Sequence, residues 1–276
     1  MGKITIKDII EKKQKKKITM LTCYDYSFAR ILDEAGVDII LIGDSLANVV
    51  LGLEETRRVA LGEMLNHTKA VALGVRRSLV VADMPYVAYQ RNTKRCVVQA
   101  RKFIKAGAEA VKIEWFKDCP YVVEKLIKDK IPVMGHIGLT PQTVHLLGGY
   151  KIQGRNQEEA LVLLKQAKIL QKLGVFSLVL ECIPWQVSKL ITKSLKIPTI
   201  GIGAGKYCNG QVLVLYDLLG LYKKKKPKFV RVYKDISFQI NTAVSEYISD
   251  VKRGRFPAEA ESFSLKNQHL RLKKQK

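Results

Sequence analysis

The chain has 276 residues, of which 47% are hydrophobic and 26% are charged; these ordinary proportions for a soluble globular protein exclude a disordered or collagen-like chain. No apolar stretch reaches the roughly 18 residues of a membrane span, and the amino-terminal residues lack the apolar core of a secretory signal. The five cysteines show no C-x-x-C spacing, so we expect a reduced, cytoplasmic protein without disulfides.

The net charge of +23 is concentrated in three lysine-rich segments, residues 1–17, 223–234 and 266–276. Such runs can bind nucleic acids or an acidic membrane surface by releasing counterions. Here they are not interleaved with aromatic residues, and no nucleic-acid-binding motif accompanies them. We therefore interpret them as solvated surface and tails, and we expect neither a nucleic acid nor a membrane as a partner.

The first expected element is a short basic helix, because Thr5 and Asp8 have the spacing of a capping box. After it, eight short segments rich in Val, Ile and Leu recur, as buried parallel strands do. They are Ile18–Cys23, Asp38–Gly43, Ser78–Ala82, Ala110–Ile113, Ile131–Gly135, Phe176–Leu180, Thr199–Gly203 and Val212–Tyr216. Segments with helical spacing lie between them, and most end directly before a glycine: Phe28–Ala35, Glu63–Leu73, Thr93–Ala106, Pro120–Lys130 and Glu158–Leu173.

Strands that alternate with helices indicate parallel βαβ units. Eight such units in a chain of this length predict a single (β/α)₈ barrel. We assign residues 18–265 to the barrel, residues 1–17 to the basic helix before it and residues 266–276 to a basic tail. The pattern leaves an open, doubly wound sheet as the alternative.

Acidic residues gather where the expected strands end. The carboxyl ends of barrel strands converge on one face, where active sites lie. Acids are 25 of the 276 residues, yet five of the eight expected strand ends carry one, namely Asp44, Asp83, Glu114, Glu181 and Asp217. We interpret Asp217 as a structural residue that caps the following helix.

The remaining four acids restrict the chemistry of the site. Two carboxylates about 4 Å apart repel by about 4 kcal/mol at an effective dielectric constant near 20. A cluster of several acids therefore requires a proton or a cation, and oxygen donors without paired Cys or His favour Mg²⁺. Lys112 and Glu114 are two residues apart, so on a strand both side chains point to the same face. Asp44 alone could be a helix cap, Asp83 a turn residue, and Lys112 with Glu114 an interior salt bridge. Glu181 has no such structural interpretation, which favours a functional role.

Eight ordered segments between residue 3 and about residue 263 resemble the ketopantoate hydroxymethyltransferase family. They are TCYDYSFA (22–29), GDSLANVVLG (43–52), ADMPYVAY (82–89), AGAEAVKIE (106–114), GHIGLTPQ (135–142), GGYKIQGR (148–155), VLECIP (179–184) and IGIGAGKYCNGQVLV (200–214). The resemblance implies a (β/α)₈ barrel. It also implies transfer of a hydroxymethyl group from 5,10-methylenetetrahydrofolate to 3-methyl-2-oxobutanoate for pantothenate synthesis, and a homo-oligomer, decameric in bacterial members.

The resemblance also implies a role for each site residue. Asp44 and Asp83 match the Mg²⁺ ligands, and Glu114 completes the water shell of the metal. The groups that hold the 2-oxo acid match Asp44, Ser45, Asp83 and Lys112. The proton acceptor matches Glu181, with His136 as a supporting hydrogen-bond partner. Mg²⁺ would stabilise the enolate that forms when C3 loses its proton, and Lys112 would offset negative charge beside it.

Five residues depart from the family pattern. Ala47 and the pair Trp115–Phe116 replace smaller residues, so we expect a narrower entrance to the active site. Asn209 and Glu261 replace an aspartate and a histidine, which puts peripheral folate or subunit contacts in doubt. No departure removes a metal or base candidate, so we expect activity.

Three other functions stay open at this point. The chain could be a different Mg²⁺-dependent 2-oxo-acid aldolase or lyase on the same barrel. It could instead use Lys112 as a Schiff-base nucleophile. A basic barrel that binds RNA or a scaffold protein is the non-enzymatic alternative, and the strand-end acids argue against RNA on that face.

Overall fold

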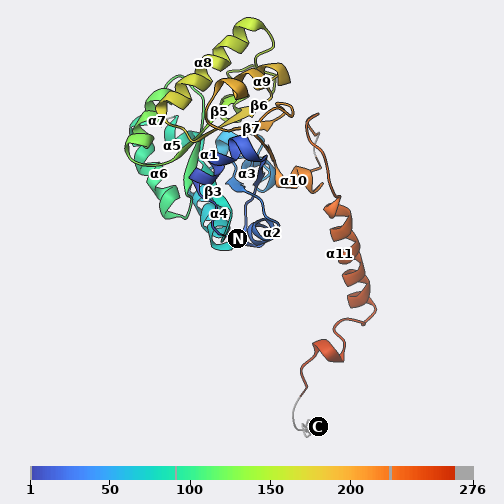
Figure 1. Cartoon of the computed structure of the whole chain (residues 1–276). Coiled ribbons are helices and arrows are strands. Elements are labelled where there is room, and N and C mark those ends of the chain that lie inside the picture. The colour runs from blue at the N-terminus through green and yellow to red at the C-terminus, as the bar shows by residue number, and fades with distance from the viewer. Residues whose placement is uncertain (1, 91, 224–225, 265–276) are drawn as a thin grey trace, which may run out of the picture.

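The computed structural model describes residues 2–90, 92–223 and 226–264. Eight parallel strands follow one another around a closed barrel, and the last strand pairs with the first (Figure 1). The strands are β1 (Ile18–Thr22), β2 (Ile39–Ile42), β3 (Leu79–Asp83), β4 (Ala110–Glu114), β5 (Val133–Gly138), β6 (Ser177–Glu181), β7 (Thr199–Ile202) and β8 (Gly210–Leu213). The (β/α)₈ prediction is confirmed, and the closed pairing excludes an open sheet.

Helices alternate with the strands as predicted. They are α1 (Ile6–Lys15), α2 (Tyr26–Glu34), α3 (Leu46–Val49), α4 (Leu61–Gly74), α5 (Tyr86–Tyr89), α6 (Cys96–Lys105), α7 (Cys119–Lys128), α8 (Gln157–Leu173), α9 (Trp185–Ser194), α10 (Leu215–Leu218) and α11 (Ile236–Lys252). Between β7 and β8 a short loop, residues 203–209, replaces the helix. None of the helices in the described part of the chain combines the length and apolar composition that a membrane span requires.

The eighth strand lies earlier than predicted, at Gly210–Leu213 rather than Val212–Tyr216. It closes the barrel because Gly210 lies against β1, where a Cβ atom would come within 2.5 Å of the Ile18 carbonyl oxygen. The sequence does not indicate where β8 ends, because the apolar run continues past the strand into α10. Asp217 therefore lies inside α10 and neither ends a strand nor caps a helix. That prediction was wrong, and four acids remain at strand ends.

Helix α1 closes the amino-terminal end of the barrel. The expected capping box is present, because the Thr5 hydroxyl accepts a hydrogen bond from the Asp8 amide and the Asp8 carboxylate accepts one from the Thr5 amide. Ile9 is fully buried and packs with residues that point into the barrel. Lys13 donates to the Thr192 carbonyl at 3.0 Å and Lys17 to the Cys208 carbonyl at 2.5 Å. Part of the amino-terminal lysine excess thus holds α1 against the barrel.

The core has two parts. One apolar cluster fills the barrel interior, with Met20, Leu41 and Val81 among its members. A larger cluster lies between the strands and the surrounding helices. Burial of both faces explains the continuous apolar runs of the strands. The expected tail 266–276 lies outside the described residues, and the division of the chain at residues 17 and 265 stays a prediction.

Candidate active site

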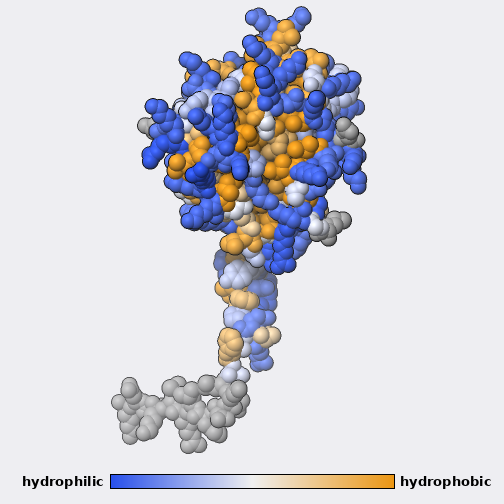
Figure 2. Space-filling model, turned by 60° about the vertical axis from the view of Figure 1, so that its left-hand side comes forward, coloured by the Kyte–Doolittle hydropathy of each residue, from blue (hydrophilic) through white to orange (hydrophobic). Residues whose placement is uncertain are grey.

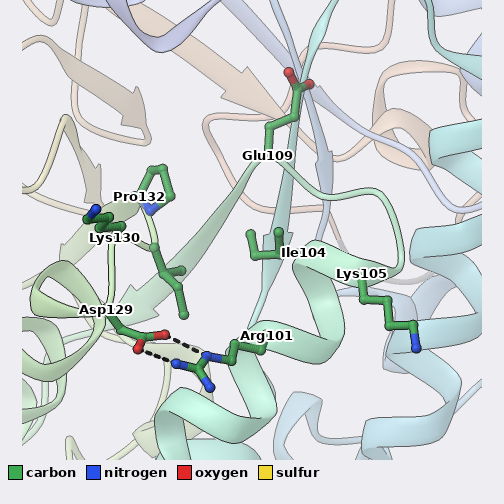
Figure 3. Close-up of a pocket in the computed structure, with 8 residues that line it drawn as sticks. Arg101, Ile104, Lys105, Glu109, Asp129, Lys130 and Pro132 are labelled. Atoms are coloured by element: carbon green, nitrogen blue, oxygen red, sulfur yellow. Dashed lines mark hydrogen bonds and ion pairs between the residues drawn. The ribbon is translucent and has the colours of Figure 1, made fainter.

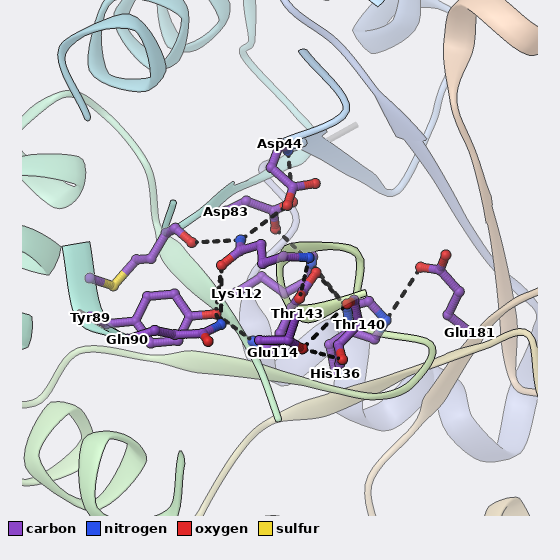
Figure 4. Close-up of polar contacts among 12 residues, drawn as sticks. Asp44, Asp83, Tyr89, Gln90, Lys112, Glu114, His136, Thr140, Thr143 and Glu181 are labelled. Carbon is purple, nitrogen blue, oxygen red and sulfur yellow. Dashed lines mark hydrogen bonds and ion pairs between the residues drawn. The ribbon is translucent and has the colours of Figure 1, made fainter. Parts of the chain in front are cut away.

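The polar residues predicted from the strand ends lie together at the carboxyl-terminal end of the barrel (Figure 4). Strands β2 to β6 carry them in order: Asp44 follows β2, Asp83 ends β3, Lys112 and Glu114 lie on β4, His136 on β5, and Glu181 ends β6. The strand register pairs Asp83 with Lys112 and Glu114 with His136. Residues that are far apart in sequence therefore become direct neighbours.

Lys112 and Asp83 form a buried ion pair. The Lys112 Nζ atom is 2.9 Å from Asp83 Oδ1, and the two side chains are only 6% and 3% exposed. The other Asp83 oxygen accepts a hydrogen bond from the Asp44 amide at 3.0 Å. Burial raises the pKa of Asp83 to about 7, although the Lys112 charge opposes the shift. Burial alone would lower the pKa of Lys112, but the surrounding carboxylates, chiefly Asp83, outweigh it and raise that pKa.

Glu114 and His136 are also almost fully buried, 1% and 2% exposed. Burial, together with the charge of Asp44, raises the pKa of Glu114 well above its usual value. Burial and the Lys112 charge lower the pKa of His136, so its ring is neutral. His136 Nδ1 lies 3.3 Å from Lys112 Nζ. An ammonium can only donate, so Nδ1 accepts and the ring proton is on Nε2.

Glu181 lies beside Nε2 of the same ring, without a hydrogen bond to it. Its Oε2 atom is 3.3 Å from His136 Nε2, and its side chain is 15% exposed, the most open of the four acids. Burial raises the pKa of Glu181 to about 7, with the Lys112 charge opposing. A carboxylate with this pKa can accept a proton near neutral pH.

The backbone around Glu181 is tightly constrained. A Cβ atom on Gly138, whose φ is +99°, would lie 2.2 Å from the Glu181 carbonyl oxygen. Cys182 follows with a φ of +49°, a conformation that residues other than glycine seldom adopt. Such strain persists only where neighbouring structure enforces it. The end of β6, and with it the base of the Glu181 side chain, is thus fixed.

Ser45 begins a chain of hydroxyl groups beside Asp44. Its Oγ atom is 2.8 Å from the Tyr24 hydroxyl, which donates to Thr22 Oγ1 at 2.9 Å. Tyr24 is fully enclosed at 1% exposure. The chain connects the end of β1 to the end of β2 and orients Ser45 next to the acids.

Gln142 was missed by the sequence reasoning, although it lies at the centre of the network. Its side-chain amide donates to Asp44 Oδ2 and to the Met84 carbonyl, both at 3.0 Å. The amide oxygen accepts from the Tyr89 hydroxyl at 3.0 Å, and the backbone amide donates to Glu114 Oε2 at 3.1 Å. One residue thus holds two of the four acids. The only sequence signal was its position in the GHIGLTPQ segment.

Replacing Gln142 with Leu is expected to lower both thermal stability and turnover, the latter on the order of 10²-fold. The change leaves buried polar partners unpaired, each at a cost of about 1–3 kcal/mol. Thermal melts and steady-state kinetics measure the two effects. Gln153→Leu is the matched control, because the Gln153 side chain bonds only an exposed carbonyl. A Gln142→Leu variant as stable and as active as this control would contradict the assignment.

The carboxylates of the site can bind a hard cation such as Mg²⁺ in one arrangement. Among the described residues no three His, Cys, Asp or Glu side chains are arranged as ligands of one metal ion. Mg²⁺ does not require three, since it binds one or two carboxylates and keeps several waters. Asp44 and Asp83 are adjacent, and Glu114 Oε1 is a buried oxygen without a hydrogen bond. The raised pKa values of Asp83, Glu114 and Glu181 also mean that these acids, beside the single ammonium of Lys112, require either protons or a further cation. These residues fit a magnesium ion held by two carboxylates, with Glu114 acting through water.

A surface depression at the amino-terminal end of the barrel is not a candidate active site. Glu109 and Pro132, which line it, directly precede β4 and β5, at the amino-terminal ends of the strands (Figure 3). Its floor carries an exposed ion pair between Arg101 and Asp129. In (β/α)₈ barrels this end contributes stability, and chemistry occurs at the opposite end.

The departures from the family pattern replace none of the charged residues of this network, although the Trp115 amide donates to the His136 carbonyl and the Phe116 ring packs edge-on against Tyr89. Ala47 is fully buried, and Trp115 and Phe116 pack against the core. The Asn209 side chain accepts from the Thr199 amide and donates to the Lys13 carbonyl, so it links α1 to β7. Glu261 lies in an exposed turn (Glu259–Glu261), where it accepts from the Ala258 amide.

The closed barrel and the acidic cluster at its carboxyl-terminal end define the class of the protein, a (β/α)₈-barrel enzyme. The model of the ketopantoate hydroxymethyltransferase family matches residues 3–259. The chain belongs to this family of transferases, which confirms the resemblance seen in the sequence segments.

Individual relatives agree with the family match. A 3-methyl-2-oxobutanoate hydroxymethyltransferase of Caldicellulosiruptor saccharolyticus is 51% identical over 264 residues, 95% of this chain and all of that protein. Enzymes of the same name from Clostridium botulinum (strain Langeland) and Acetivibrio thermocellus are 50% and 49% identical, each across 95% of this chain and 96% and 94% of their own lengths.

Solved structures are similar in fold. Phosphonopyruvate hydrolase, in a complex with oxalate and Mg²⁺, superimposes with a TM-score of 0.59 at 12% identity, covering 96% of this chain and 93% of its own. A 2,3-dimethylmalate lyase gives a TM-score of 0.59 at 13% identity with the same coverage. At these identities the likeness shows the shared barrel alone.

Proposed function

We propose that the protein transfers a hydroxymethyl group from 5,10-methylenetetrahydrofolate to 3-methyl-2-oxobutanoate in the cytoplasm, forming 2-dehydropantoate for pantothenate synthesis. Relatives of that name, about 50% identical over nearly their full length, support it. The observation that carries the proposal is the position of Glu181, a partly open carboxylate that faces the buried Lys112–Asp83 pair across His136.

The difficult step is removal of the C3 proton of the 2-oxo acid, since C3 is acidified only by the adjacent ketone. Glu181 accepts this proton, and the His136 ring lies beside its carboxylate, with Nε2 at 3.3 Å from Oε2. Lys112 and Ser45 bind the anionic substrate, and the ammonium offsets the charge that moves onto the ketone oxygen. C3 then forms a bond to the one-carbon unit, whose two C–N bonds to the folate are broken in the overall transfer, so that tetrahydrofolate leaves. The net transfer consumes one water, which supplies the hydroxyl oxygen.

Asp44 and Asp83 would hold Mg²⁺ directly and Glu114 through a water, and the bound ion would supply Lewis-acid polarisation of the 2-oxo acid. The charges around Lys112 argue against the Schiff-base alternative. A lysine nucleophile requires a lowered pKa, whereas the acids around Lys112 raise its pKa and keep it an ammonium.

Deuterium exchange at C3 of 3-methyl-2-oxobutanoate tests the proposal. We expect exchange with Mg²⁺ in the absence of folate, loss of exchange after chelation with EDTA, and recovery when Mg²⁺ is restored. Proton NMR of the substrate methyl groups measures the rate. Exchange that survives complete metal removal would contradict the metal assignment, and turnover of the 2-oxo acid without folate would favour an aldolase or lyase.

A further inference from the structure

The active site is covered on the side of β2 to β5 and accessible beside Glu181. The 3₁₀ turn η1 (Thr56–Arg58), in the loop after β2, packs against η3 (Pro141–Thr143), in the loop after β5, and against α5 in the loop after β3. Because β3 and β4 lie between β2 and β5, these loops meet above the ends of β3 and β4. The acids at the ends of β2 to β4 are buried beneath them, whereas Glu181 and Ile202, which end β6 and β7, are partly exposed. The accessible part of the site therefore lies on the side of β6 and β7.

Phe229 lies at this accessible side, next to the strand end that carries Glu181. The strand register pairs Glu181 with Ile202, and the Cys182 amide donates to the Ile202 carbonyl at 2.9 Å. Gly203 follows directly with a φ of +62°, and a Cβ atom on it would lie 2.7 Å from the Phe229 ring. The ring therefore rests on bare glycine backbone, one residue beyond the partner of Glu181. Because Phe229 is only partly buried, part of its side chain is accessible to a ligand.

A tight turn presents Phe229 together with a lysine. The Val230 amide donates to the Pro227 carbonyl at 3.0 Å, which makes Lys228 and Phe229 the central residues of the turn. Lys228 is exposed, and no carboxylate in the described part of the chain pairs with it. Hydrophilic side chains project from much of the barrel surface (Figure 2). The position of Lys228 beside Phe229, and not its charge alone, therefore distinguishes it from the other surface lysines.

Tyr150 approaches the same opening from the other side of Glu181. It belongs to the loop after β5, which is held beside the end of β6 because the Gln153 amide donates to the Cys182 carbonyl at 2.9 Å. Tyr150 is 64% exposed, yet partial burial and the charges of Asp44 and Glu181 raise the pKa of its hydroxyl. The hydroxyl is therefore within electrostatic range of the acids. One aromatic side chain thus lies on each side of the accessible carboxylate.

The co-substrate of the proposed function has the chemistry that this opening can bind. 5,10-Methylenetetrahydrofolate combines a bicyclic pterin ring system, an aminobenzoyl ring and a glutamate with two carboxylates. Its one-carbon unit must reach C3, which lies at Glu181 when that residue takes the proton. The attached ring system must therefore lie at the accessible side of the site, where aromatic side chains can stack on it. The glutamate then extends outward, where an exposed ammonium can pair with a carboxylate.

We propose that 5,10-methylenetetrahydrofolate enters between Phe229 and Tyr150, with its ring system against Phe229 and its glutamate carboxylates toward Lys228. The inference rests on the proposed function, because it assigns a binding place to the folate of that reaction. It gives the lysine-rich segment 223–234 a contact with an acidic substrate, where the sequence predicted only a solvated surface. The 2-oxo acid then lies among the polar residues of β2 to β6, and the folate lies over Gly203.

Steady-state kinetics with varied 5,10-methylenetetrahydrofolate tests the aromatic contacts. Phe229→Leu keeps an apolar side chain against Gly203 but removes the ring, and should raise the KM for the folate about 10-fold. Tyr150→Leu should give a similar rise, while Phe229→Tyr restores the ring and should keep the parental KM. A Phe229→Leu or Tyr150→Leu variant with the parental KM for the folate would overturn the proposal. C3 exchange without folate is measured on each variant, and a fall in exchange as large as the loss of transfer would overturn the proposal too, because the residue would then act on the 2-oxo acid.

The glutamate contact is tested with a folate whose two glutamate carboxylates are replaced by carboxamides. Lys228→Met should raise the KM for the natural folate about 3-fold at low salt, the scale of one exposed ion pair, and added salt should reduce the difference. The parent and Lys228→Met should have the same KM for the neutral bis-amide. Lys165→Met, which removes an exposed lysine from α8, is the matched control and should keep the parental KM for both folates.

The outcomes separate this inference from the proposed function. A Lys228→Met variant with the parental KM for the natural folate, or with an equal rise in KM for the bis-amide, would overturn the inference alone, because the parent still transfers the one-carbon unit. A parent that exchanges C3 but transfers nothing from the folate would overturn the proposed function, and the inference with it.

Discussion

The Glu181→Gln variant is expected to lose C3 exchange of 3-methyl-2-oxobutanoate, by a factor on the order of 10²–10⁴, while it still binds the 2-oxo acid. The amide has the size of the carboxylate and keeps its contact with His136, but it cannot take the proton. Proton NMR measures exchange, and isothermal titration calorimetry with the 2-oxo acid measures binding. Glu158→Gln is the matched control, since Glu158 is exposed on α8.

The pH dependence of the parent provides a second readout of the same group. Because burial raises the pKa of Glu181 to about 7, exchange should increase as pH rises through that value and the carboxylate ionises. A raised carboxyl pKa also means that ionisation of Glu181 disfavours the folded state above that pH. Glu181→Gln should therefore be at least as stable as the parent at pH 8. A loss of exchange in this variant could then not be attributed to unfolding. A variant that exchanges as fast as the parent would show that another group takes the proton.

Much of this architecture could be predicted because barrel strands carry two kinds of local signal. Apolar runs such as Asp38–Gly43 mark strands buried on both faces, and glycines such as Gly107 and Gly174 mark the helix ends. The two-residue periodicity of a strand predicts that Lys112 and Glu114 share one face. Convergence of strand ends then follows from parallel topology alone.

The parts that could not be predicted depend on contacts between distant segments. Gln142 bonds a carboxylate 98 residues away, and no local pattern distinguishes it from an ordinary loop glutamine. The error at Asp217 had a related cause, since the start of β8 is set by the approach of Gly210 to Ile18 and not by hydrophobicity. The sequence reasoning also missed α11, Ile236–Lys252, which buries none of its residues in its own chain.

The Lys112→Met variant is expected to lose exchange by about 10²–10³-fold, the scale seen when one group that stabilises developing charge is removed. Methionine keeps the length and apolar stem of lysine, so the change mainly removes the ammonium 2.9 Å from Asp83. Breaking a buried pair by removing one partner costs about 3–5 kcal/mol of stability. Exchange kinetics, 2-oxo acid titrations and thermal melts measure the three effects.

Lys128→Met is the control for the loss of a lysine charge. The Lys128 side chain is 67% exposed and pairs with Glu124 at 2.8 Å on the surface of α7, where an ion pair contributes about 0–1 kcal/mol. Its activity should stay at the parental level. Borohydride added to the parent with 2-oxo acid should leave the protein mass unchanged, because Lys112 acts as a charge and forms no covalent bond. A reduced adduct on Lys112, or a Lys112→Met variant with parental exchange, would contradict that role.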